Sequence, residues 1–334
     1  MYLDYVIRRF GIMVLIFALA VTINFALPRL SPGDPVEQQL SQLMASSGGQ
    51  VGDVRAMVES YRQRFGLDQP VWRQYLDYWA MVLSLDLGFS LANYPERVGE
   101  SIAGAMPWTL GLLGMATLIS FAAGTLLGGL LAWPRAPRWL GWFAAPFMVL
   151  SAIPYFLIGV ILLFLGAIVY RIFPAGGGFP FELTPRADWA TVSGILWHAT
   201  LPALSIVLAQ IGAWAIGMRG MLVSVLGEDH IVLAEAKGLT QRRIFLWYAV
   251  RNALLPQLTK LALTLGHLVS GAILVEVIFS YPGMGYRLYQ AIQSKDYFVV
   301  QGIVLILSLS IAVTMFILDL LYPLIDPRIT NRRN

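Results

Sequence analysis

Few residues of this 334-residue chain have the type and spacing that catalysis or metal binding requires. There is no cysteine, which excludes disulfides, thiolate metal sites and cysteine catalysis. The three histidines, His198, His230 and His267, show no metal-ligand spacing. No lysine stands in a Gly-x-x-x-x-Gly-Lys-Ser/Thr loop, and no Gly-x-Ser-x-Gly or His-Glu-x-x-His motif is present. The sequence therefore predicts a protein that is not an enzyme, does not hydrolyse ATP itself and has no cofactor of its own.

The composition is that of a membrane protein. Hydrophobic residues make up 57% of the chain and charged residues 13%, with a mean hydropathy of +0.68. Soluble domains have about 45–50% apolar and 25% charged residues. The sequence predicts an all-α polytopic membrane protein, and its net charge of +4 is expected to set orientation in the lipid bilayer rather than to bind nucleic acid.

Apolar runs long enough to cross a bilayer predict six transmembrane helices, at residues 11–27, 106–133, 140–169, 199–225, 254–278 and 302–321. The first run is longer than the core of a cleaved signal peptide. The second is rich in small residues and is expected to be buried among other helices. The third contains Pro146 and Pro154 and is expected to be a kinked helix that faces the lumen.

The Lys and Arg residues orient these spans, because short cytoplasmic loops carry an excess of them. With both termini inside, the cytoplasmic set is Arg8, Arg9, Arg135, Arg138, Arg219, Lys237, Arg242, Arg243, Arg251, Arg328, Arg332 and Arg333. The short external loops hold only Arg171, Arg186, Arg287 and Lys295. The predicted regions are a stub and first span (1–28), an extracytoplasmic lobe (29–104), a five-span core (105–323) with a cytoplasmic loop (227–251), and a cytoplasmic tail (324–334). Within the lobe, an amphipathic stretch from Val71 to Leu87 has aromatic residues that suit a membrane surface.

The polar segment 227–251 is too long for a simple connection between two spans. Asp229 is expected to cap a short helix that stops at Gly238, and Thr240 to cap a second helix that starts at Gln241. Apolar side chains are expected to be wetted here, namely Ile231, Val232, Ala234 and Leu239. The pattern fits a docking element for a cytosolic protein, or a helix that lies on anionic lipid.

Three ionisable residues at membrane depth are candidates for a translocation path, because charge in hydrocarbon is costly. They are His267 and Glu276 in the fifth run and Asp319 in the sixth. For the two carboxylates, a local role in holding helix ends fits equally well. For His267, a hydrogen bond to a neighbouring helix fits better.

The residues Ala234-Glu-Ala-Lys-Gly238-Leu, followed by Arg242-Arg243 and Arg251-Asn-Ala-Leu-Leu-Pro256, resemble the "EAA" loop of binding-protein-dependent ABC importer permeases. The version is that of the first permease of dipeptide, oligopeptide and nickel systems. Further motifs resemble this family in the same order, including Leu30-Ser-Pro-Gly-Asp-Pro35, Asp86-Leu-Gly-Phe-Ser90, Glu276-Val-Ile-Phe-Ser-Tyr-Pro-Gly-Met-Gly285, Asp296-Tyr297 and Asp319-Leu-Leu-Tyr322. Two departures, Val232 for the leading Glu and Arg251 for a later Pro, look typical of the peptide-type branch.

The resemblance implies a type I ABC importer permease fold in the bacterial plasma (inner) membrane. It implies a second homologous permease, two subunits that bind ATP and Mg, and an extracytoplasmic solute-binding protein, which Trp72, Tyr75 and Asp77 of the lobe are expected to meet. The helix that ends at Gly238 would be the coupling helix. The ATPase-coupling positions are Asp229, Ala234, Glu235, Ala236, Lys237, Gly238, Leu239, Arg242 and Arg243.

The function that the resemblance implies is uptake of short peptides through half of a shared pore. The same machinery carrying oligosaccharides, opines or nickel stays open, because only the binding protein would separate these substrates. An ion-coupled secondary transporter is an alternative of a different class, and a structural membrane scaffold is another. Neither explains the 227–251 segment, and no inverted repeat is visible that would favour the secondary transporter.

The orientation gives a first testable prediction. A reporter fused after Asn334 should be cytoplasmic, and one inserted near Ser47 should be external, because the Lys and Arg residues demand it. Paired reporters that are active on only one side of the membrane measure this directly. Opposite labelling at the two sites would rule out the six-span arrangement.

Overall fold

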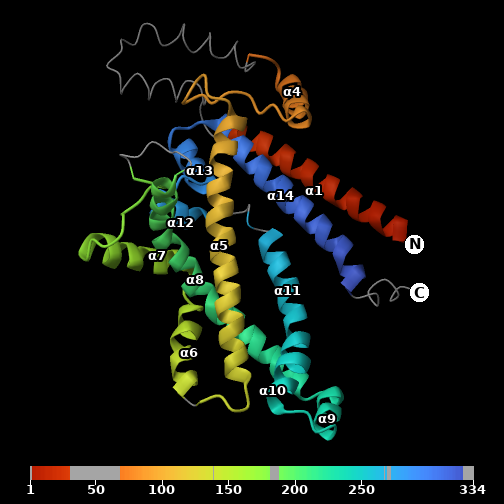
Figure 1. Ribbon diagram of the computed structural model, residues 1–334. Helices are drawn as coiled ribbons and strands as arrows, with labels where there is room; N and C mark the ends of the chain where they lie inside the picture. Colours follow the sequence, from red (N-terminus) through yellow and green to blue (C-terminus); the bar gives the residue numbers. More distant parts are fainter. Residues whose placement is uncertain are drawn as a thin grey trace. The chain divides into compact units, whose positions relative to one another are not determined.

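The computed structural model describes residues 2–30, 68–137, 139–180, 188–266, 268 and 272–325 (Figure 1). These residues are mostly helical, and their only extended pairing is an isolated bridge between Phe89 and Arg97. The all-α prediction is therefore confirmed for the described part of the chain. The chain divides into two compact units: unit 1 comprises Met1–Pro107 with Gly283–Asn334, and unit 2 comprises Trp108–Pro282.

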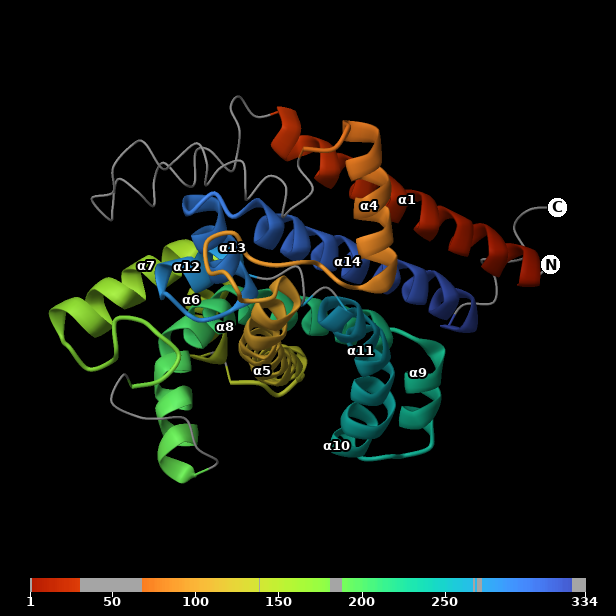
Figure 2. The ribbon, with the colours of Figure 1, turned by 90° about the horizontal axis from the view of Figure 1, so that it is seen from above.

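Two long helices, α1 (Tyr2–Leu30) and α14 (Tyr297–Ile325), pack side by side in unit 1 (Figures 1 and 2). Each contains a stretch long and apolar enough to cross a membrane, Asp4–Ala26 and Tyr297–Leu320. These stretches match the first and last predicted spans. Residues 31–67 of the predicted lobe and 326–334 of the predicted tail lie outside the described residues.

The helix α4 (Val71–Ser84) lies across α1 (Figure 2). Its predicted amphipathic character is confirmed, because Tyr78 and Val82 are buried in a cluster with residues of α1 and α14, namely Val21, Phe25 and Leu305. The buried amide of Asn24 donates to the Tyr78 hydroxyl (2.9 Å) and to the Gln301 carbonyl (2.8 Å). Asn24 thus ties three helices together where apolar packing gains little from the hydrophobic effect.

Unit 2 is organised around α8 (Trp189–Leu226) and the part of α5 (Val98–Ala132) that belongs to it. Gly124 and Gly128 of α5 lie against α8 so closely that a Cβ at Gly128 would be 2.3 Å from the Ala215 carbonyl oxygen. The predicted close approach is confirmed at these two positions. Around Gly111 and Gly129, by contrast, the space for a Cβ is open.

The third predicted span is bent far more sharply than a kink. It comprises α6 (Trp139–Leu150), α7 (Tyr155–Leu163) and the π-helix η1 (Phe164–Val169), with a bend of 99° between α6 and the rest. The break falls just before Pro154, because proline lacks an N–H group and disfavours helical geometry in the residue before it. Pro146, the other expected breaking point, lies inside α6.

Two other boundaries differ from expectation. The helix α8 begins at Trp189, within the predicted loop, where the Asp188 carboxylate accepts a hydrogen bond from the Thr191 N–H (2.8 Å). The fifth predicted span is two helices, α11 (Arg251–Gly266) and α12 (Ile273–Ile278). Among the described residues, four helices are long and apolar enough to span a membrane, or five if α6 and α7 form one span. The expected count of six is therefore not confirmed.

Replacing Gly128 by alanine should destabilise the packing of α5 on α8, because the new Cβ would meet the Ala215 carbonyl oxygen at 2.3 Å and the Met218 Cβ at 2.9 Å. Overpacking of this kind costs about 1–3 kcal/mol. We expect a lower thermal unfolding midpoint of the purified protein in detergent. Gly129→Ala is the matched control, because nothing lies within 4 Å of its Cβ. An equal loss of stability in both variants would contradict the packing role.

Candidate functional site

The segment 227–251 folds as a chain of short helical pieces that follow α8 and lead into α11, namely α9 (Asp229–Ala236), α10 (Gln241–Arg243) and the π-helix η2 (Ile244–Val250). Glu228 occupies the N-cap position of α9, and Asp229, the expected cap, is the first helical residue. The Asp229 carboxylate therefore stabilises α9 through the helix dipole, because negative charge is favourable in the first turn of a helix. Thr240 is the N-cap residue of α10, as predicted, but its side chain makes no capping hydrogen bond.

The helix α9 ends in a Schellman motif. Gly238 has a φ of +73°, a conformation that glycine adopts without steric cost. The Gly238 N–H donates to the Glu235 carbonyl (2.8 Å), and the Leu239 N–H donates to the Ala234 carbonyl (3.3 Å). These two bonds satisfy carbonyl groups that the helix end leaves free. The predicted stop at Gly238 is confirmed.

The helix α9 has a buried face and an exposed face. Ile231 and Ala234 are 4% and 2% exposed, and they pack in a cluster with residues of α8, η2 and α11, namely Met218, Leu222, Ile244, Phe245, Ala249 and Ala253. The expectation that Ile231 and Ala234 are exposed to water is therefore wrong. A helix this short is not stable by itself, so it stays folded only because one apolar face packs against the rest of the protein. Val232 and Leu233 are 61% and 57% exposed. They are the apolar side chains that a partner can reach.

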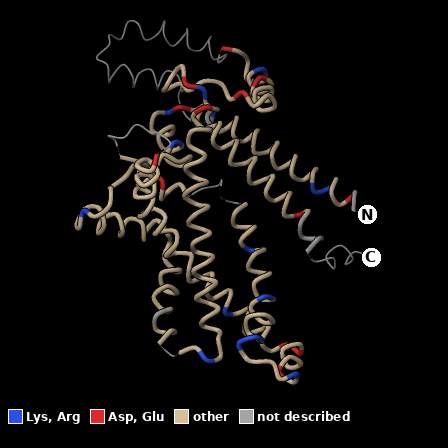
Figure 3. Tube along the Cα trace, viewed as in Figure 1, with Lys and Arg blue, Asp and Glu red and all other residues tan. Residues whose placement is uncertain are grey.

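Charged residues of both signs lie on and beside this exposed face, and Figure 3 shows Lys, Arg, Asp and Glu residues at this end of unit 2. The predicted coupling positions that are exposed are Asp229, Glu235, Ala236, Lys237, Gly238, Arg242 and Arg243, while Leu239 is half-buried. The Gln241 side-chain amide donates to the Glu235 carboxylate (2.9 Å) and links α10 to α9. A cavity of about 380 Å³ lies beside α10, lined by Trp133, Pro134, Arg135, Gln241 and Phe245.

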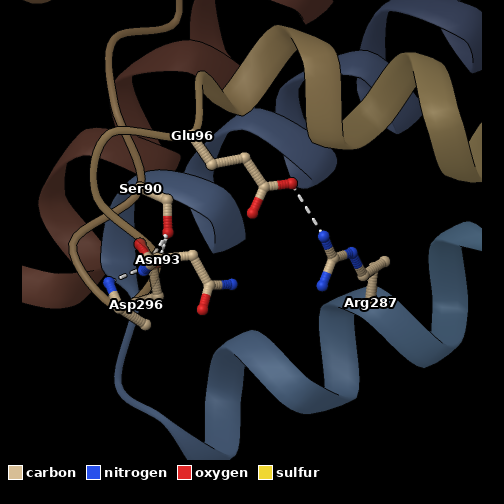
Figure 4. Close-up of polar contacts among 6 residues, drawn as sticks. Ser90, Asn93, Glu96, Arg287 and Asp296 are labelled. Atoms are coloured by element: carbon tan, nitrogen blue, oxygen red, sulfur yellow. Dashed lines mark hydrogen bonds and ion pairs between the residues drawn. The ribbon is translucent and has the colours of Figure 1, made fainter.

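A second polar cluster lies in unit 1, between the strap of residues 85–97, the helix α13 (Met284–Gln293) and the start of α14 (Figure 4). The buried carboxylate of Asp296 accepts hydrogen bonds from the Ser90 hydroxyl, from the Ala92 N–H (3.0 Å) and from the Val299 N–H (3.3 Å). Ser90 and Asp296 are 0% and 1% exposed. Nearby, Arg287 donates to Glu96 (2.8 Å) in an ion pair.

This Asp296 cluster fastens the strap to the first turn of α14. A buried carboxylate is tolerated only where hydrogen bonds replace its hydration, and here the strap and the helix supply them. Sequence reasoning missed this contact, which joins residues 206 positions apart. The signal was present in part, because Ser90 and Asp296 both lie in motifs that carried the family resemblance. The Asp296 carboxylate, which is buried and hydrogen-bonded, therefore has a structural role.

A family profile described as "Binding-protein-dependent transport system inner membrane component" matches residues 124–331. The chain belongs to this family. The permease is 32% identical to the dipeptide transport system permease protein DppB of Escherichia coli K12, over 99% of the chain and 100% of the relative. It is 32% identical to the di/tripeptide transport system permease protein DppB of Pseudomonas aeruginosa, with the same coverage. It is 35% identical to the probable D,D-dipeptide transport system permease protein DdpB of E. coli, over 95% of the chain and 94% of the relative.

These similarities confirm the resemblance to peptide-type ABC importer permeases and, with the apolar helices, mark a multi-pass membrane protein. Of the residues predicted to lie along a path through the permease, His267 lies outside the described residues. Glu276 of α12 is fully buried and accepts a hydrogen bond from the Thr109 hydroxyl (2.7 Å). Burial, and secondly the charge of Glu276, raises the pKa of Tyr281 to about 12, so this phenol stays neutral.

Asp319 of the permease pairs with Arg9 (3.1 Å), and its backbone carbonyl accepts a hydrogen bond from the Tyr5 hydroxyl (2.9 Å). Both contacts join α14 to α1 within unit 1. Glu276 and Asp319 thus make local contacts between helices, as the alternative interpretation expected. Their place along a translocation path stays a prediction.

Replacing Asp296 by alanine should destabilise the permease by roughly 3 kcal/mol or more, because hydrogen bonds to a buried charged group contribute about 1.5–3 kcal/mol each. The measurement is the thermal unfolding midpoint in detergent, followed by tryptophan fluorescence. Asp86→Ala is the control on the same strap, because the Asp86 side chain is 64% exposed and its partner Arg97 is 4.0 Å away. If Asp296→Ala left the midpoint unchanged, the cluster would not hold the strap.

Proposed function

We propose that this chain is the transmembrane permease subunit of an ATP-driven ABC importer and forms half of a translocation pore for short peptides. The proposed substrate rests on the relatives, which are named as dipeptide, di/tripeptide and D,D-dipeptide permeases. The proposed coupling to ATP rests on α9, a short helix closed by Gly238 that exposes Val232 and Leu233. A loop that only joined two spans would need neither feature.

The proposed assembly has five subunits. The chain pairs with a second homologous permease, and two partner subunits bind ATP and Mg and hydrolyse the ATP, so that this chain is not an enzyme. An extracytoplasmic solute-binding protein delivers the substrate, in keeping with the family description. The chain takes the type I permease fold in the bacterial inner membrane, with α6 and α7 as the third span, α11 and α12 as the fifth, and both termini in the cytoplasm.

The coupling mechanism follows from the two faces of α9. Val232 and Leu233 would enter an apolar cleft on an ATP-hydrolysing subunit, with Lys237, Arg242 and Arg243 as a charged rim that favours an acidic partner surface. The buried face would carry the resulting motion inward. Ile231 and Ala234 are packed with Ile244 and Phe245 of η2, and η2 continues directly into α11. A displacement of α9 therefore moves α11 with it, since a close-packed interface transmits strain.

The test replaces Gly238 by valine and, in a second variant, by asparagine. An added Cβ meets nothing within 4 Å, so only the positive φ penalises the change. That penalty is about 1–2 kcal/mol for an ordinary residue and larger for a β-branched one, whereas asparagine tolerates the conformation. We expect near-normal membrane levels of Gly238→Val, weak retention of the ATPase subunits and little uptake. Gly238→Asn should retain both.

The assay measures ATP-dependent uptake of labelled dipeptides and tripeptides into proteoliposomes, beside co-purification of the ATPase subunits. Val169→Ile, a conservative change at the exposed end of η1, should alter neither readout. Full uptake and full ATPase retention by Gly238→Val would remove the coupling role of α9. If the wild type transported an oligosaccharide, an opine or nickel instead of peptides, the peptide assignment alone would fall. Uptake that persisted without ATPase subunits would indicate a secondary transporter.

A further inference from the structure

The helix α4 has three distinct sides. The side that packs on α1 and α14 carries Tyr75, Tyr78 and Val82. A second side is apolar and exposed, with Trp72, Leu76 and Leu83 at 64%, 56% and 77% exposure. A third side is polar and exposed, with Arg73, Asp77 and Ser84. At 3.6 residues per turn, each set lies along one edge of the helix, and the apolar and polar edges flank the packed side.

Two hydrogen bonds show which way each edge faces. The Tyr75 hydroxyl is bonded to the Thr22 hydroxyl (2.8 Å), and the Gln74 side-chain carbonyl accepts from Arg29 (2.5 Å). Thr22 and Arg29 are about 10 Å apart along α1 at a rise of 1.5 Å per residue. On the surface of α4, Gln74 therefore lies toward the C-terminal end of α1, and Tyr75 lies toward the middle of α1.

Around the circumference of α4, the apolar edge of Trp72, Leu83 and Leu76 comes next after Tyr75. The polar edge of Asp77, Ser84 and Arg73 comes next after Gln74, in the opposite direction. The apolar edge of α4 therefore faces the middle of α1, and the polar edge faces away from it. The stretch of α1 on the apolar side belongs to its membrane-spanning part, Asp4–Ala26, whereas Arg29 lies just beyond that part.

Toward the middle of α1, the face that carries Thr22 and Arg29 continues in exposed apolar side chains, with Val14 and Leu15 at 46% and 60% exposure.

We infer that α4 is an interfacial anchor that lies in the bilayer leaflet at the C-terminal end of α1. Its apolar edge, formed by Trp72, Leu76 and Leu83, enters the acyl chains, and its polar edge faces water and headgroups. Lipid is the occupant because this edge continues the lipid-facing surface of α1, at the level where its span ends. Tryptophan and tyrosine favour that level of a bilayer. The inference goes beyond the proposed transport function.

The expected binding-protein surface of Trp72, Tyr75 and Asp77 does not form a single face on α4. Trp72 belongs to the apolar edge, Asp77 to the polar edge, and Tyr75 is hydrogen-bonded to Thr22 between them. A protein that docked from the aqueous side would meet Asp77 but not Trp72. The geometry therefore favours lipid over protein at the apolar edge.

The test uses the absence of cysteine from the chain, which allows single-cysteine variants to be spin-labelled without removing native residues. Leu76→Cys and Leu83→Cys place a nitroxide on the apolar edge. Asp77→Cys and Ser84→Cys, at neighbouring positions, place one on the polar edge and are the matched controls. The full-length variants are reconstituted in phospholipid vesicles, and collision rates with oxygen and with a water-soluble nickel chelate are measured by electron paramagnetic resonance.

Oxygen concentrates in acyl chains, so the ratio of oxygen to nickel collisions should be several-fold higher at positions 76 and 83 than at 77 and 84. Equal, water-like ratios at all four positions would overturn the inference. So would protection of positions 76 and 83 from both reagents, or a loss of their oxygen collisions when purified solute-binding protein is added. The label spectra report whether α4 is ordered, and no transport is required, so a failed uptake assay leaves this result standing.

Discussion

A helix in hydrocarbon must satisfy every backbone N–H and C=O group within the protein, because lipid offers no partners. This requirement explains why the described chain is helical and why its breaks are so carefully supported. Beside α12 in unit 2, the Gly177 N–H donates to the Phe279 carbonyl (2.9 Å) and the Tyr281 N–H donates to the Glu276 carbonyl (2.8 Å). The break that follows α12 thus has substitutes for the missing helical bonds.

The same solvent removes the usual drive for one apolar helix to pack on another, so unit 1 and unit 2 rely on different contacts. Unit 2 uses glycine, which brings the backbones of α5 and α8 together at Gly124 and Gly128. Unit 1 uses buried polar groups, with Asn24 joining α1, α4 and α14, and Asp296 joining the strap to α14. The short α9 needs neither device, because Ile231 and Ala234 give it an apolar core of its own.

Composition alone predicted the long apolar helices, since the length of a span is set by bilayer thickness. The stop at Gly238 was also predictable, because a glycine after a short periodic stretch has a local cause. Two breaks could not be predicted, namely the sharp bend before Pro154 and the division of the fifth run into α11 and α12. A helix can break only where neighbouring residues satisfy the backbone N–H and C=O groups that the break frees, and the sequence does not show these neighbours. The sequence also could not show that Ile231 is buried and Val232 exposed, because this depends on the position of η2. The pairing of Ser90 with Asp296 could not be predicted either, because the two residues are far apart in the sequence.

The attachment of α4 to α1 has a consequence for how the protein responds to bilayer thickness. The apolar stretch Asp4–Ala26 has 23 residues, which corresponds to about 34 Å of helix against a hydrocarbon thickness of about 30 Å. A free helix of this length relieves hydrophobic mismatch by tilting at little cost. Here α1 is fastened through Thr22, Asn24 and Arg29 to a helix that lies across it. With α4 held in the bilayer leaflet, a tilt of α1 toward either end of α4 lifts one end of α4 and lowers the other, so the crossing geometry limits tilt in that direction.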